Sequence, residues 1–149
     1  MTLKPKIYDH YLHSIQDKIA MEQNNLDELK ESGANETKST AGDKHETALA
    51  MLQIEQANTR GRLNELQQQL AVLEKINPVA LSEKILSGSL IQTDKGYFFL
   101  SIAAGKTVVE GQTVIAISPQ SPLGLQLINA RKGESVAVHT TRYTILKVE

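Results

Sequence analysis

The chain has 149 residues, enough for one domain or two small ones, and its formal net charge is -1. This near-neutral charge gives no electrostatic reason to expect binding to nucleic acid or to an anionic membrane. The chain has no cysteine, which excludes disulfides, thiolate metal sites and cysteine nucleophiles. No signal peptide or membrane-spanning stretch is evident, so we expect a soluble, cytoplasmic protein.

The N-terminal segment has the apolar repeat of a coiled-coil helix. Its seam positions, spaced by three or four residues, are Tyr8, Leu12, Ile15, Ile19, Leu26 and Leu29, with Glu22 at the missing position. The repeat ends after Leu29, where the sequence becomes polar and rich in small residues. The pattern therefore predicts that this part of the chain is a long helix.

A second seam predicts another helix from about Lys44 to Ile76. Its apolar positions are Leu49, Leu52, Leu63, Leu66, Leu70 and Leu73, and its centre is polar, with Gln56 and Thr59. Neither seam can be buried alone, so we predict an antiparallel helical hairpin over residues 1–77 with its tip near 40–47. A monomer suits this hairpin, and an intermolecular coiled coil is the alternative.

From Pro78 onward the apolar pattern changes to period two. Six β-branched segments between residues 89 and 148 predict an antiparallel sheet of five or six strands. One stretch differs, because Ser121 and Pro122 read as a helix cap and first turn, followed by Leu123, Leu127 and Ile128 on one face. We therefore predict an α+β chain whose second domain, 78–149, is a small sheet with one short helix.

The predicted tip carries two carboxylates, Asp43 and Glu46, three residues apart. Asp43 can be a helix N-cap with Glu46 as its partner at the third helical position, an ordinary capping box. The same spacing places both carboxylates on one side of a helix start, where they can converge on a hard cation. Both interpretations stay open.

Two stretches carry a family resemblance. "SPLG" (121–124), two apolar residues and "KGE" (132–134) resemble the C-terminal signature of bacterial Gre transcript-cleavage factors. The tip "GDKHE" matches the family's tip motif at Gly42, Asp43 and Glu46, and "GRLNEL" (61–66) resembles a further motif after a one-residue gap. After Glu46, however, "TALAM" lacks the Asn, Glu and Tyr of the family tip.

The resemblance implies an accessory factor for RNA polymerase rather than an enzyme. A C-terminal domain of FKBP-like fold is expected to dock on the polymerase, with Ser121, Pro122, Leu123 and Gly124 as candidate partner-binding residues. The hairpin is then expected to enter the secondary channel, where Asp43 and Glu46 help to hold an Mg²⁺ shared with the polymerase. No cofactor in the free protein, no membrane contact and no sequence-specific nucleic-acid contact are implied.

Three other functions stay open from the sequence. The altered tip suits a secondary-channel modulator or inhibitor without cleavage activity. A structural coiled-coil interaction protein needs no polymerase at all. A peptidyl-prolyl isomerase is the enzyme alternative for an FKBP-like fold, but it needs an aromatic pocket, and the chain has only two Phe, four Tyr and no Trp.

Overall fold

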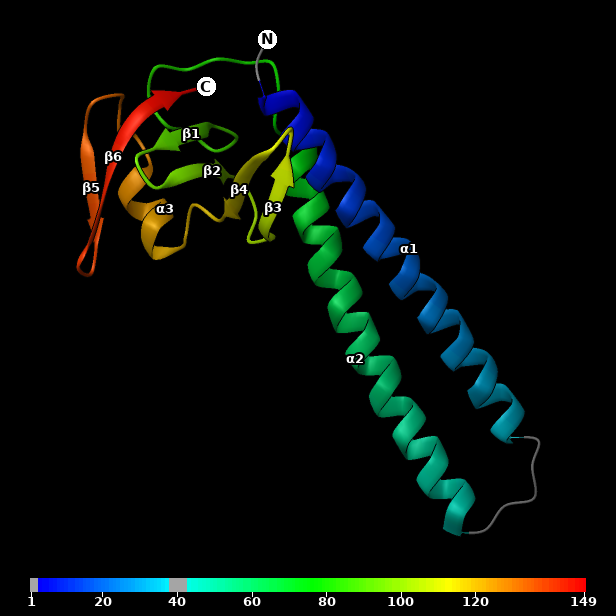
Figure 1. The fold of residues 1–149 in the computed structure, drawn as a ribbon. Coiled ribbons are helices and arrows are strands. Elements are labelled where there is room, and N and C mark those ends of the chain that lie inside the picture. Colours follow the sequence, from blue (N-terminus) through cyan, green and yellow to red (C-terminus); the bar gives the residue numbers. More distant parts are fainter. Residues whose placement is uncertain (1–2, 38–42) are drawn as a thin grey trace. The chain divides into compact units, whose positions relative to one another are not determined.

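The computed structural model describes residues 3–37 and 43–149, with side chains at 3–34 and 46–149 (Figure 1). Two long helices, α1 (Lys4–Thr37) and α2 (Asp43–Glu74), precede six strands and one short helix. The predicted α+β class is thereby confirmed. None of the helices in the described part of the chain has an apolar stretch that could cross a membrane.

The chain forms two compact units. The sheet unit consists of Met1–His13 with Ala71–Glu149, and the hairpin unit consists of Ser14–Leu70. The sheet unit thus includes the first turns of α1 and the last turn of α2. The predicted limits, 1–77 and 78–149, concern which fragments fold independently and stay a prediction.

The hairpin unit buries the seam that the apolar repeat predicts. Ile15, Leu26 and Leu63 are buried, and Gln56 Nε2 donates to the Leu29 carbonyl across the pair at 3.3 Å. The α2 bounds agree within two residues with the predicted helix. Helix α1 continues beyond the end of the seam at Leu29 to Thr37, in agreement with a tip near 40–47. Loss of the seam removes the coiled-coil signal but not helix formation, since the segment contains no proline.

The sheet unit contains a six-stranded sheet in the order β3-β4-β2-β1-β6-β5. The strands are β1 (Leu90–Thr93), β2 (Gly96–Leu100), β3 (Gly105–Val109), β4 (Gln112–Ile117), β5 (Ser135–Val138) and β6 (Thr141–Val148). Every pair is antiparallel, as predicted, except that β2 and β4 run parallel. Strand β3 lies between β2 and β4 in the sequence, and this crossover allows β4 to run beside β2 in the same direction.

Each face of the sheet is covered by a helix of the same unit. Leu127 of α3 (Pro122–Leu127) joins a buried cluster with Ile91, Phe98 and Ile145. Neighbouring residues on a strand point to opposite faces. Accordingly Phe99, next to Phe98, stacks against Tyr11 of α1 on the other face, with ring centroids 6.1 Å apart.

Candidate functional site

The end of the hairpin carries the predicted tip acids. Helix α2 begins at Asp43, and Glu46 is exposed in its first turn. The side chain of Asp43 lies outside the described residues, so the convergence of the two carboxylates stays a prediction. Within the described part of the chain, no group of three or more His, Cys, Asp or Glu side chains can hold a metal ion.

Midway along the hairpin unit, the seam becomes polar. Arg62 Nε donates to Glu22 Oε2 at 3.2 Å, and Arg62 Nη2 donates to the Thr59 hydroxyl at 3.1 Å. Thr59 is only 1% exposed, and its hydroxyl donates to the Glu55 carbonyl at 2.8 Å. Each buried polar group therefore has a partner, and the layer favours the register that pairs Glu22 with Arg62.

Helix α3 is built by the residues that resemble the family signature. The Ser121 hydroxyl accepts from the Gly124 N–H at 3.0 Å and donates to the Ser118 carbonyl at 2.6 Å, and Pro122 occupies the first turn. A Cβ on Gly124 would lie 2.1 Å from the Ser118 oxygen, so only glycine fits there. The capped turn explains why these residue types occur together.

The predicted apolar face of α3 is confirmed. Leu127 is fully buried, and Leu123 and Ile128 pack against the same cluster. Pro122 is exposed, and Leu125 is 60% exposed. Of the candidate partner-binding residues, Ser121 and Gly124 thus serve the helix itself, and Pro122 offers a surface to another molecule. Their role in docking stays a prediction.

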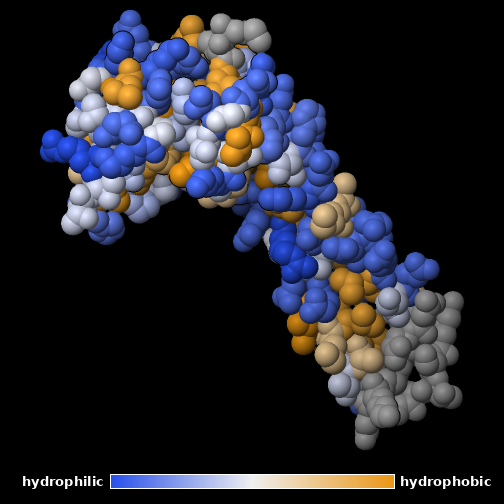
Figure 2. Space-filling view, in the orientation of Figure 1, coloured by the Kyte–Doolittle hydropathy of each residue, from blue (hydrophilic) through white to orange (hydrophobic). Residues whose placement is uncertain are grey.

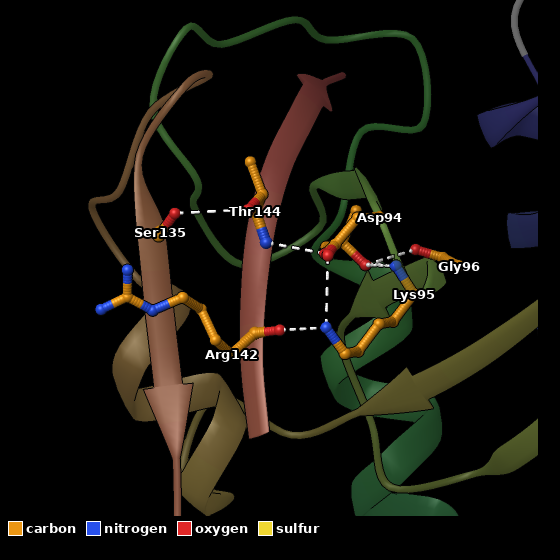
Figure 3. A network of polar contacts seen from close by, with 7 residues as sticks. Asp94, Lys95, Gly96, Ser135, Arg142 and Thr144 are labelled. Carbon is orange, nitrogen blue, oxygen red and sulfur yellow. Dashed lines mark hydrogen bonds and ion pairs between the residues drawn. The ribbon is translucent and has the colours of Figure 1, made fainter. Parts of the chain in front are cut away.

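A polar network joins the β1–β2 turn to β6 (Figure 3). Asp94 Oδ1 accepts from the Thr144 N–H at 2.8 Å, and Lys95 Nζ pairs with Asp94 Oδ2 at 3.2 Å and also donates to the Arg142 carbonyl. The Thr144 hydrogen bond, followed by the contact with Lys95, lowers the pKa of Asp94. Every partner in this network is a strand or turn group, so the network fixes strand pairing.

Aromatic residues of the sheet unit are used in packing. Phe98 and Phe99 are buried, and the Tyr11 hydroxyl donates to the Gly105 carbonyl at 2.7 Å. Burial raises the pKa of Tyr11 to about 12. Phe98 meets Tyr143 edge-on, with centroids 5.6 Å apart. The rings of Phe98, Phe99 and Tyr143 are therefore engaged in packing, whereas Tyr97 lines a surface hollow. The isomerase alternative stays open.

The apolar patterns in the sequence did not predict the positions of two sets of residues in the fold. Tyr11 is buried against the sheet and Lys4 is buried beside the loop after α2, but neither occupies a seam position of the apolar repeat. A groove beside β6, described below, is lined by Leu81, Arg131 and Lys147. Its residues come from three distant segments, so no spacing in the sequence signals it.

No protein-family model and no curated protein matches the chain. Among solved structures it is similar to the transcription factor Gfh1, with 19% identity, 92% of each chain covered and a TM-score of 0.38. It is also similar to Gfh1 of Thermus aquaticus, with 19% identity, 97% of this chain and 93% of that chain covered, and a TM-score of 0.33. At these values the likeness does not indicate a function.

Proposed function

We propose that this protein is an accessory transcription factor that acts on RNA polymerase by inserting its helical hairpin into the secondary channel. The observation that carries the proposal is the position of Glu46, exposed in the first turn of a helix that begins at Asp43. A long hairpin that ends in carboxylates is suited to delivering them into a narrow channel. The sequence resemblance to Gre factors supports the same role.

The charge of the hairpin unit favours a protein partner over nucleic acid. Residues 14–70 contain ten acidic and six basic side chains. Binding to a nucleic-acid backbone depends on basic side chains that neutralise phosphates. An acidic hairpin lacks this attraction, so direct nucleic-acid binding is not part of the proposal.

The donors at the tip fit Mg²⁺ only as part of a shared site. Mg²⁺ prefers carboxylate and water oxygens and gives up its water reluctantly, so one or two carboxylates complete a site whose remaining ligands come from elsewhere. In the proposal those ligands belong to the polymerase, and Mg²⁺ supplies charge stabilisation for phosphodiester cleavage. Asp43 and Glu46 then orient the ion and its water, and the free protein binds no Mg²⁺ tightly.

The sheet unit is the proposed docking module. The capped turn at Ser121 and Gly124 holds α3 rigidly, with Leu123 turned toward the core. Pro122 and Leu125 remain exposed on the same helix and are the proposed contact. The protein is proposed to bind as a monomer, because its hairpin supplies both seams of the coiled coil.

A second candidate function is modulation of the polymerase without cleavage. It is favoured by "TALAM" after Glu46, where the family tip continues with Asn, Glu and Tyr. Both candidates require polymerase binding, and they differ only in what the tip does in the channel.

Co-purification of the full chain with core RNA polymerase tests the proposal. We expect stoichiometric binding that is weakened when Pro122 and Leu125 are both changed to Glu. Val108→Glu is the matched control, because Val108 is 61% exposed on β3 and does not belong to the proposed contact. Absence of binding by the unaltered chain would favour the structural coiled-coil alternative.

A further inference from the structure

The segment between α2 and β1 holds large apolar side chains in solvent. Val79 is 72% and Leu81 is 73% exposed. The backbone on either side is fixed, since Lys4 Nζ donates to the Ala80 carbonyl at 2.8 Å and the Ile85 N–H donates to the Ala130 carbonyl at 2.8 Å. Figure 1 shows this segment running as a loop near the C-terminal end of β6. The exposure of Leu81 is thus part of the folded structure and not a result of a loose chain.

Leu81 stands at one end of a groove beside the last residues of β6. A hollow of about 370 Å³ is lined by residues 81–83 and 147–149. A second hollow, of about 460 Å³, is lined by Arg131 and Lys132 and shares Glu83, Lys147 and Val148 with the first. Together they form one surface, here called the β6 groove, which is apolar at Leu81 and Val148 and polar toward Arg131.

The outer edge of the β6 groove is positively charged. Lys147 Nζ pairs with Glu149 Oε1 at 2.7 Å, and this hydrogen bond raises the pKa of Lys147. The Glu149 side chain is only 10% exposed, so its charge faces inward. Arg131 Nη1 lies 3.5 Å from Glu83 Oε2, and both side chains are largely exposed, so this pair is weak.

Lys132 adds a further positive charge to this edge. It is exposed, and among the described residues no carboxylate lies within ion-pair distance of it. The positive groups at the edge thus outnumber the negative groups that reach solvent. On the face that Figure 2 presents, isolated hydrophobic side chains of the sheet unit stand among strongly hydrophilic ones.

We propose that the β6 groove binds a segment of a partner protein that sets an apolar side chain against Leu81 and Val148 and carboxylates against Arg131 and Lys132. An apolar anchor inside a polar rim is the usual arrangement of a protein interface. A single-stranded nucleic acid is a poorer match, because its bases stack on aromatic rings and none lines the groove. This interaction goes beyond the proposed function and does not depend on the hairpin or on the polymerase.

Titration of the full-length, ¹⁵N-labelled protein with short synthetic peptides tests this proposal. The probe has a central Phe flanked by Glu, and the matched control has Lys in place of each Glu. We expect saturable shifts in the amide signals of residues 79–86, 131–132 and 146–148 with the Glu peptide alone. Leu81→Ser and Lys132→Glu should each weaken binding about fivefold or more, as loss of an interface anchor does.

Matched variants on another surface of the sheet unit distinguish binding at the β6 groove from nonspecific binding of the peptide. Val108→Ser and Lys106→Glu on β3 also change exposed residues, and they should leave the affinity unchanged. All four variants replace exposed side chains, and retained amide spectra confirm their fold. The proposal is overturned by equal binding of the Lys peptide, by shifts elsewhere, by unchanged affinity in the groove variants, or by no saturable shift at millimolar peptide. Displacement of the Glu peptide by an oligouridine would also overturn it.

Discussion

Replacing Leu127 by Ala tests whether α3 is held on the sheet as the structure shows. Leu127 is fully buried and belongs to the cluster with Ile91 and Ile145. The change removes three carbon atoms, which at about 0.8 kcal/mol for each buried methylene amounts to about 2.4 kcal/mol. The cavity left in a close-packed core adds to this loss, so we predict a total destabilisation of about 2.7–5 kcal/mol.

Urea unfolding followed by amide NMR signals of β1 and β6 measures this loss within the sheet unit alone. Leu125→Ala is the matched control, since it makes the same chemical change on the same helix at a side chain that is 60% exposed. Its effect should stay within about 0.5 kcal/mol. Equal losses in the two variants, or a loss below about 0.5 kcal/mol for Leu127→Ala, would refute the placement of α3.

Three further predictions concern hydrogen bonds and close packing in the sheet unit. Tyr11→Phe removes the hydrogen bond to the Gly105 carbonyl and should lower the free energy of unfolding in urea at neutral pH by about 0.5–1.5 kcal/mol. The ultraviolet titration of the variant should lack the tyrosine that ionises near pH 12, and an unchanged titration would contradict the assignment of that pKa to Tyr11. The pKa of Asp94 is lowered in the folded state, so its contribution to stability is present above pH about 4 and is lost as pH falls through the folded pKa. Asp94→Asn should therefore reduce the dependence of the urea midpoint on pH in this acidic range, and an unaltered dependence counts against the network. Gly124→Ala places a Cβ against the Ser118 oxygen and should lower the thermal midpoint, whereas an unchanged midpoint shows that the turn can relax.

The elements of this fold were largely predictable because their patterns are local. The alternation of apolar residues marks each strand, and the three-four spacing marks each seam, as the burial of Ile15, Leu26 and Leu63 confirms. Ser121 and Pro122 likewise predicted where helix α3 begins. Each of these signals depends only on residues that are close in the sequence.

Features that depend on distant residues were not predictable. The alternation in β2 and β4 is the same whether two strands run parallel or antiparallel, so it could not reveal the parallel pairing. Tyr11 and Lys4 lie off the coiled-coil seam, and they meet β3 and the loop at Ala80 only after the chain has folded back. The β6 groove likewise combines residues from segments that are distant in the sequence.

The candidate site was predictable only in part. Glu46 is exposed, as expected for a residue at the tip of the hairpin. The hydrogen bond between Ser121 and Gly124 shows that part of the family-like signature caps helix α3 itself.

Cleavage of RNA in a backtracked RNA polymerase complex tests the central claim most directly. The comparison is between the unaltered protein and a variant with Asp43→Asn and Glu46→Gln, which keeps the shape and much of the capping capacity of both side chains. We predict that the unaltered protein stimulates cleavage, and that the variant binds polymerase equally well without stimulating it. Equal stimulation by the two proteins would contradict the role of the tip carboxylates. Binding without stimulation by the unaltered protein would replace the cleavage function with modulation.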